Sequence, residues 1–123
     1  DSRIYLWGHS MGGAGTYHLA ARYPEIWAGL AAAAPAPRRE ALDEVEAFKD
    51  IPVLVLHGDA DVTVPVAGSR TWVARMRELG MQHVYIEVPG GDHSLFVREV
   101  PETLSKVFAF FNIVGKRERA VRQ

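Results

Sequence analysis

The sequence predicts an α/β fold: a three-layer sandwich in which a mostly parallel sheet is covered by helices on both faces. Short apolar segments and helix-like segments alternate four times along the 123 residues, and this alternation is typical of parallel sheets. The strand-like segments are apolar throughout, as expected for strands that are buried on both faces. The length suits a single domain, and no internal repeat or low-complexity linker divides the chain.

Four strands are expected, each of them short, apolar and bounded by glycine, proline or a polar turn. The composition of residues 27–34 suits either a strand or a helix, and the length of this segment and its place after a helix favour a strand. The expected strands are residues 3–8, 27–34, 53–57 and 84–88.

Four helices are expected between and after these strands. Pro24 and Gly80 end the first and the third, because the residue before proline leaves helical geometry and glycine suits the position after a helix. Pro101 suits the first turn of the last helix. The expected helices are residues 11–23, 38–50, 66–79 and 101–114. The last helix has an apolar stripe that predicts packing on the sheet through Leu104, Val107, Phe108 and Phe111.

We expect residues 1–115 to form the domain and the charged segment 116–123 to fray.

The composition excludes several classes of function. The net charge of −1 gives no electrostatic reason to bind nucleic acid or an anionic membrane surface. The absence of cysteine excludes disulfides and thiol catalysis, and no apolar segment is long enough to span a bilayer. No pair of histidines has metal-ligand spacing with nearby carboxylates, so we expect no metal; nothing in the sequence fixes the compartment.

Ser10 is the candidate nucleophile, because it lies in Gly8-His9-Ser10-Met11-Gly12 between the first expected strand and the first expected helix. A Gly-x-Ser-x-Gly sequence in this context is typical of a nucleophile elbow, a sharp turn that holds the serine hydroxyl clear of the backbone. We expect Gly8 and Gly12 to allow a close approach of strand and helix. The alternative is an ordinary turn serine that caps the helix.

Acidic and basic partners for Ser10 follow two later strands. Asp59 and Asp61 follow the third expected strand, and His93 follows the fourth. Because working residues of parallel α/β sheets lie beyond the carboxyl ends of the strands, these side chains are expected to converge. An imidazole can take the proton of a serine hydroxyl near neutral pH, and a carboxylate can orient that imidazole. The chain order Ser, Asp, His is the order of the α/β-hydrolases.

On these motifs the chain resembles the C-terminal half of an α/β-hydrolase of the dienelactone-hydrolase, carboxylesterase and prolyl-oligopeptidase-like kind. The elbow continues to Gly13, residues 57–65 fit the pattern His-Gly-x-x-Asp-x-x-Val-Pro, and residues 91–93 read Gly-Asp-His. The resemblance covers nearly everything from residue 3 to residue 114. It implies that Ser10 is the nucleophile, Asp61 the acid and His93 the base, and that the backbone N–H of Met11 belongs to the oxyanion hole.

The resemblance also implies a serine hydrolase that cleaves small-molecule carboxylic esters through an acyl-enzyme and needs no cofactor. A prolyl-oligopeptidase-like peptidase and a non-catalytic binding module of the same fold stay open as alternatives. The family has about four strands and two helices before the elbow, including a loop that gives the second oxyanion N–H. We expect the same longer chain or another subunit to supply them, because residues 3–8 would otherwise leave an exposed apolar sheet edge.

The remaining polar and aromatic residues receive simpler structural interpretations. Asp59 is expected to bond within its own loop and Asp92 to be solvated, while His9 packs under the elbow and His57 bonds backbone. We expect Trp27 and Trp72 to pack in the core or on the surface, although both could border a substrate pocket. His18 and His83 are expected to face solvent, and Arg38 and Arg39 to form a solvated helix start.

Overall fold

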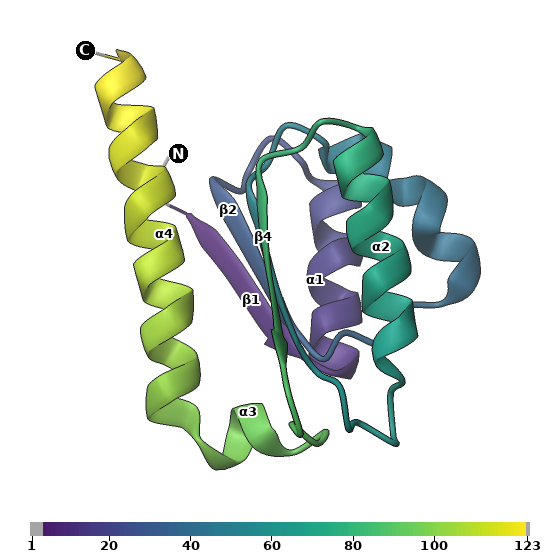
Figure 1. The fold of residues 1–123 in the computed structure, drawn as a ribbon. Helices are drawn as coiled ribbons and strands as arrows, with labels where there is room; N and C mark the ends of the chain where they lie inside the picture. Colours follow the sequence, from purple (N-terminus) through teal and green to yellow (C-terminus); the bar gives the residue numbers. More distant parts are fainter. Residues whose placement is uncertain (1–3, 123) are drawn as a thin grey trace.

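The protein forms a four-stranded parallel sheet in a computed structural model that describes residues 4–122 (Figure 1). The strand order follows the chain, and every neighbouring pair is parallel. The strands are β1 (Tyr5–His9), β2 (Gly29–Ala33), β3 (Val53–Gly58) and β4 (His83–Val88). The helices are α1 (Met11–Arg22), the 3₁₀ helix η1 (Arg39–Phe48), α2 (Val66–Glu78), α3 (Leu95–Arg98) and α4 (Val100–Arg122).

Helices cover both faces of the sheet, and the predicted three-layer α/β fold is confirmed. In Figure 1, α1, η1 and α2 lie on one face and α4 lies on the other. Successive side chains of β3 enter opposite layers, as the pleat of a strand requires: Val53 and Val55 pack under α1 and α2, and Leu54 and Leu56 pack under α4. Because all four strands are parallel, their carboxyl ends lie at one edge of the sheet.

An aromatic stack forms the centre of the layer under α1 and α2. The ring of Tyr17 lies parallel to that of Trp72, with ring centroids 4.4 Å apart, and also stacks on Phe48. All three side chains are buried. The packing role expected for Trp72 is confirmed, with its side chain in the core, and the stack fixes α1, η1 and α2 relative to one another.

Two expectations about the helices are wrong. The helix expected at 38–50 is present as the 3₁₀ helix η1, and the short helix α3 is an element that the sequence did not predict. Helix α4 continues to Arg122 instead of ending at residue 114. Phe108 does not pack on the sheet but is 61% exposed, since the buried face of α4 follows i, i+3, i+4 and i+7 from Val107. The division of the chain at residue 115 and the fraying of 116–123 stay predictions.

Strand β1 lies at an edge of the sheet. It pairs only with β2 in the part of the chain that the structure describes. Its residues are half-buried, whereas those of β2 and β3 are buried throughout. Within residues 4–122 no helix combines the length and the apolar character that a bilayer crossing requires.

Candidate active site

Ser10 has the backbone of a strained turn between β1 and α1. Its φ of 59° and ψ of −115° lie in a region that residues other than glycine rarely adopt. The turn is held by backbone bonds to the end of β2 and the segment after it: the Ser10 N–H donates to the Ala33 carbonyl, and the Ser10 carbonyl accepts from the Ala36 N–H. The Ser10 side chain makes no capping hydrogen bond with α1. This geometry matches a nucleophile elbow better than a helix cap.

The elbow requires glycine at position 8 but not at position 12. A Cβ atom on Gly8 would lie 2.2 Å from the Gly12 carbonyl oxygen, so the expected close approach is confirmed there. At Gly12 a Cβ atom would meet nothing within 4 Å, and the expectation for that glycine is wrong. The neighbouring Gly13 is the constrained one, because its Cβ would lie 2.9 Å from Pro35.

Met11 begins α1 directly after the elbow. Its side chain is 82% exposed, while its backbone N–H belongs to the first turn of the helix, where N–H groups have no intrahelical acceptor. Such N–H groups, together with the positive end of the helix dipole, favour negative charge nearby. The position is chemically suited to an oxyanion.

Asp61 is a buried carboxylate that two backbone groups and one imidazole hold in place. Its Oδ1 accepts from the backbone N–H of Thr63 (2.9 Å) and of Val64 (2.7 Å), and its Oδ2 accepts from His93 Nδ1 (2.8 Å). Burial by itself raises the pKa of this carboxyl, but the Val64 N–H, His93 and the Thr63 N–H outweigh burial and lower the pKa below its usual range. The carboxylate is therefore ionised at neutral pH.

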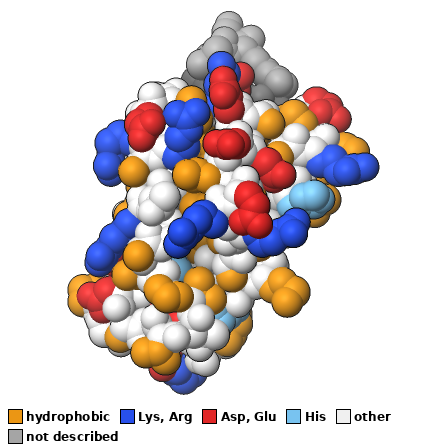
Figure 2. Space-filling view, turned by 90° about the vertical axis from the view of Figure 1, so that its right-hand side faces the viewer, with side chains coloured by type: hydrophobic (Ala, Val, Ile, Leu, Met, Phe, Trp, Pro, Cys, Tyr) orange, Lys and Arg blue, Asp and Glu red, His pale blue; other side chains and the backbone are white. Residues whose placement is uncertain are grey.

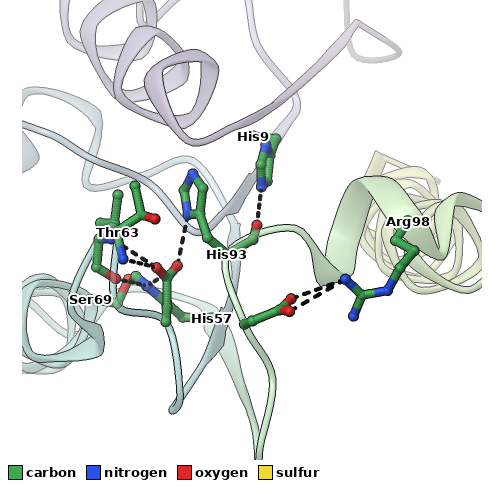
Figure 3. Close-up of polar contacts among 9 residues, drawn as sticks. His9, His57, Thr63, Ser69, His93 and Arg98 are labelled. Carbon is green, nitrogen blue, oxygen red and sulfur yellow. Dashed lines mark hydrogen bonds and ion pairs between the residues drawn. The ribbon is translucent and has the colours of Figure 1, made fainter.

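His93 is brought to Asp61 and to the elbow at the same time (Figure 3). Its Nδ1 donates to Asp61, so the other ring nitrogen points away from the carboxylate. His9 Nε2 lies 3.0 Å from the His93 carbonyl oxygen, and the centroids of the two imidazoles are 5.0 Å apart. Since His9 directly precedes Ser10, the loops that carry Ser10, Asp61 and His93 meet at one edge of the sheet.

The loops after β3 and β4 are also locked to each other. A Cβ atom on Gly58 would lie 2.2 Å from the Gly91 carbonyl oxygen, so the two backbones touch. Asp59 Oδ1 accepts from the Gly90 N–H at 2.7 Å. The expectation that Asp59 bonds within its own loop is thus wrong, because it joins the loop of Asp61 to the loop of His93. Asp92 is half-exposed and forms a surface ion pair with Arg98 at 3.3 Å.

His57 is the polar residue whose surroundings sequence reasoning missed. The expected backbone contact is present, since Nε2 lies 2.8 Å from the Val64 carbonyl oxygen. The same nitrogen is 3.3 Å from Asp61 Oδ2, and Nδ1 is 2.6 Å from Ser69 Oγ in α2. The spacing of four residues between His57 and Asp61 was the one available signal. Within the described residues, no three His, Asp or Glu side chains gather as a metal-binding group.

Two open cavities are lined by the segment that follows β2, which contributes Ala36 and Pro37 to both. The larger, about 470 Å³, lies between the segment after β2 and the start of α2 and borders the Thr63–Val64 turn that holds Asp61. Its lining is mostly apolar, and Arg39 is its one charged residue among those described. The second, about 370 Å³, runs along α1 and includes Met11. Trp72 lines both cavities, so this core residue also borders the candidate site.

Charged and apolar side chains are distributed unevenly over the surface around these cavities. Figure 2 shows charged side chains of both signs interspersed over the upper part of the face that carries α2 and η1, and apolar side chains gathered toward its lower end. That end carries the loops that follow the strands (Figure 1). Val62, which is 93% exposed, belongs to one of these loops, and Met11, which is 82% exposed, begins α1 directly after another.

Comparison with known proteins gives consistent results. Residues 36–117 match the sequence profile of the prolyl oligopeptidase family. Cutinase 1 from Thermobifida cellulosilytica is 30% identical over 104 residues, which are 85% of this chain and 37% of that protein. A cutinase from Thermobifida fusca is also 30% identical over 104 residues, or 32% of its length. The chain thus spans about a third of the length of these relatives.

Solved structures give the same fold. A thermostable esterase superimposes with a TM-score of 0.77 at 30% identity, over 91% of this chain and 31% of the esterase. SOBER1 from Arabidopsis thaliana superimposes with a TM-score of 0.74 at 22% identity, over 92% of this chain and 53% of that one. The second likeness shows the fold alone.

Proposed function

Because this chain belongs to the prolyl oligopeptidase family of the α/β-hydrolase superfamily, we propose that the protein is a serine hydrolase that cleaves carboxylic esters of small molecules. One observation carries the proposal: the buried Asp61 carboxylate accepts from His93 Nδ1, while His9, the neighbour of Ser10, contacts the His93 backbone. The meeting of these three loops at one edge of the sheet supports acyl transfer by a hydroxyl, an imidazole and a carboxylate.

In the proposed mechanism, Ser10 Oγ attacks the ester carbonyl carbon and gives its proton to His93 Nε2. Asp61 keeps the proton of His93 on Nδ1 and stabilises the imidazolium that forms. The backbone N–H of Met11 donates to the developing oxyanion. The alcohol leaves with the proton from His93, and a water molecule, activated by the same imidazole, then cleaves the acyl-enzyme and restores Ser10.

The cavity beside the Thr63–Val64 turn is proposed to bind part of the substrate. Its largely apolar lining suits the apolar part of an ester, and it borders the residues that hold Asp61. The names of the similar proteins, cutinase and esterase, favour an ester over a peptide. The family match favours a peptidase as the second candidate, since the same three residues can cleave an amide.

The proposal is tested with the full-length protein and p-nitrophenyl acetate. Ser10→Ala should abolish hydrolysis and labelling by a fluorophosphonate probe, because the hydroxyl is the proposed nucleophile. Ser105→Ala is the matched control, since Ser105 is an exposed residue of α4, which lies on the face of the sheet opposite to α1. Hydrolysis that survives in Ser10→Ala would refute the proposal. Comparison of p-nitrophenyl esters with peptidyl p-nitroanilides of matched acyl groups separates esterase from peptidase.

We also propose that additional strands, from the same longer chain or from another subunit, cover the free edge of β1. The support is that β1 pairs only with β2 within the described residues and that an unpaired strand edge invites further pairing. These strands would supply the second oxyanion N–H.

A further inference from the structure

A second histidine touches the carboxylate of Asp61 from the side opposite to solvent. His57 is the penultimate residue of β3 and is fully buried. It shares the face of Val53 and Val55, the face that α2 covers, because side chains alternate along a strand. Figure 3 shows His57 between Ser69 of α2 and the carboxylate that binds His93.

The partners of His57 determine which of its nitrogens carries hydrogen. Nε2 lies 2.8 Å from the Val64 carbonyl oxygen, which can only accept, so Nε2 must donate. The same nitrogen lies 3.3 Å from Asp61 Oδ2, so its N–H places partial positive charge beside the carboxylate. In the neutral imidazole, Nδ1 is then an acceptor, and the Ser69 hydroxyl at 2.6 Å donates to it.

These contacts complete the surroundings of the carboxylate. Oδ1 receives the two backbone N–H groups of Thr63 and Val64. Oδ2 receives His93 Nδ1 at 2.8 Å and faces His57 Nε2 at 3.3 Å. The Val64 residue is held from both ends, because its N–H binds Asp61 and its carbonyl binds His57. A polar chain therefore runs from Ser69 through His57 to Asp61 and His93.

We propose that His57 and Ser69 are positioning residues of the active site, which act through Asp61 to hold His93 in its working orientation. This inference rests on the proposed function. The Val64 carbonyl requires the hydrogen on Nε2 of His57, and the Ser69 hydroxyl binds Nδ1 and so holds the ring with Nε2–H directed at that carbonyl and the carboxylate. Without the hydroxyl, the buried Nδ1 loses its partner, the ring is no longer held in this orientation, and the turn that orients Asp61 loses its anchor.

The test compares Ser69→Ala with Thr103→Val in the full-length protein. Thr103 is a matched control because it is also buried and its hydroxyl also bonds within the fold, to the Phe96 carbonyl at 2.9 Å, in α4 on the other face of the sheet. Ser69→Ala should lower kcat for p-nitrophenyl acetate between about 10-fold and 100-fold with little change in KM, the scale of a misplaced catalytic group. Thr103→Val should leave kcat unchanged.

A spectroscopic readout separates positioning from stability. The proton shared by His93 Nδ1 and Asp61 should give a far-downfield ¹H NMR signal, which shifts or broadens in Ser69→Ala and stays in place in Thr103→Val. Equal kcat and an equal signal in the two variants would overturn the inference. If Ser69→Ala does not fold, His57→Gln, which keeps a donor near Nε2, should retain more kcat and more of this signal than His57→Leu; equal values would also overturn it.

Failure of the proposed function gives a different pattern. Full hydrolysis by Ser10→Ala would refute the serine-hydrolase mechanism, whereas the NMR signal would still report whether Ser69 orients the Asp61–His93 pair. Loss of activity in Ser10→Ala together with unchanged kcat in Ser69→Ala and an unchanged signal would refute the positioning role alone.

Discussion

His93 Nδ1 and Asp61 Oδ2 lie 2.8 Å apart, although the two residues are 32 positions apart in the chain. The oxygen that His93 uses is not the oxygen that the backbone uses, since Oδ1 receives the N–H groups of Thr63 and Val64. The orientation of the carboxylate is thus set by its own turn, and its charge is available to the imidazole. Substitutions can separate these two roles.

Asp61→Asn should abolish most activity while leaving the turn intact. The amide oxygen can accept from Thr63 and Val64 as Oδ1 does, but the amide nitrogen then faces His93 Nδ1–H as a second donor. The imidazole is expected to take the wrong tautomer, and kcat should fall by about 10⁴-fold. Steady-state kinetics with p-nitrophenyl acetate measures this, with Asp43→Asn, an exposed aspartate of η1, as control. An Asp61→Asn variant with near-normal kcat would exclude Asp61 as the catalytic acid.

Asp61 should also contribute to the acid sensitivity of the fold. Hydrogen bonds from Val64, His93 and Thr63 lower the pKa of its carboxyl in spite of burial. A group whose pKa is lower in the folded state stabilises the fold above its ordinary pKa of about 3.9. That contribution is lost as the pH falls through the folded-state pKa, which is lower still.

Denaturant unfolding of the wild type and of Asp61→Asn between pH 7 and pH 2 measures this effect. The difference in unfolding free energy should be constant near neutral pH and should change below about pH 4 in the sense that the wild type loses more. Arg70 and Tyr85 also lower the pKa of Glu87, to about 2. Glu87 therefore adds its own pH dependence to both proteins, and the comparison of the two removes that contribution. Parallel pH profiles of the two proteins would mean that folding does not shift the Asp61 pKa.

The two glycines of the elbow should respond differently to alanine. In Gly8→Ala the methyl group would lie 2.2 Å from a backbone oxygen of Gly12, and the backbone has to move. We expect a loss of about 1–3 kcal/mol in unfolding free energy together with loss of fluorophosphonate labelling at Ser10. Gly12→Ala meets open space and should be neutral or stabilising by up to about 1 kcal/mol, since alanine favours a helix. Thermal unfolding that ranks the two variants in the reverse order would contradict this geometry of the elbow.

The sequence predicted the strands well because each of them is a continuous apolar segment, and a buried parallel sheet needs such segments. It predicted the outer helices less well. Phe108 and Val107 are both apolar residues, and only the way α4 lies on the sheet buries Val107 and exposes Phe108. The end of α4 was misplaced because the residues after Val114 are charged, and charge alone does not end a helix.

The same distinction applies to the site. Ser10, Asp61 and His93 stand in local motifs, and each motif carries its own turn chemistry. Ser69 lies inside a helix and belongs to none of these motifs. Its contact with His57 depends on how α2 crosses β3, which no spacing in the sequence encodes. The bond from Asp59 to the Gly90 N–H likewise depends on two loops meeting in space.

The free edge of β1 leads to a prediction about association. Ile4, just before the strand, is 41% exposed, and Phe108 of α4 is 61% exposed. A protein of these 123 residues alone should therefore self-associate in sedimentation velocity experiments, because unpaired strand edges beside apolar surface template further pairing. Ile4→Lys should reduce this association, since a charged edge resists pairing. Leu19→Lys on α1, a position 37% exposed that lies on a helix and not on an edge strand, is the matched control and should not. A monomer at every concentration, or an equal effect of the two lysines, would show that the β1 edge does not need a partner.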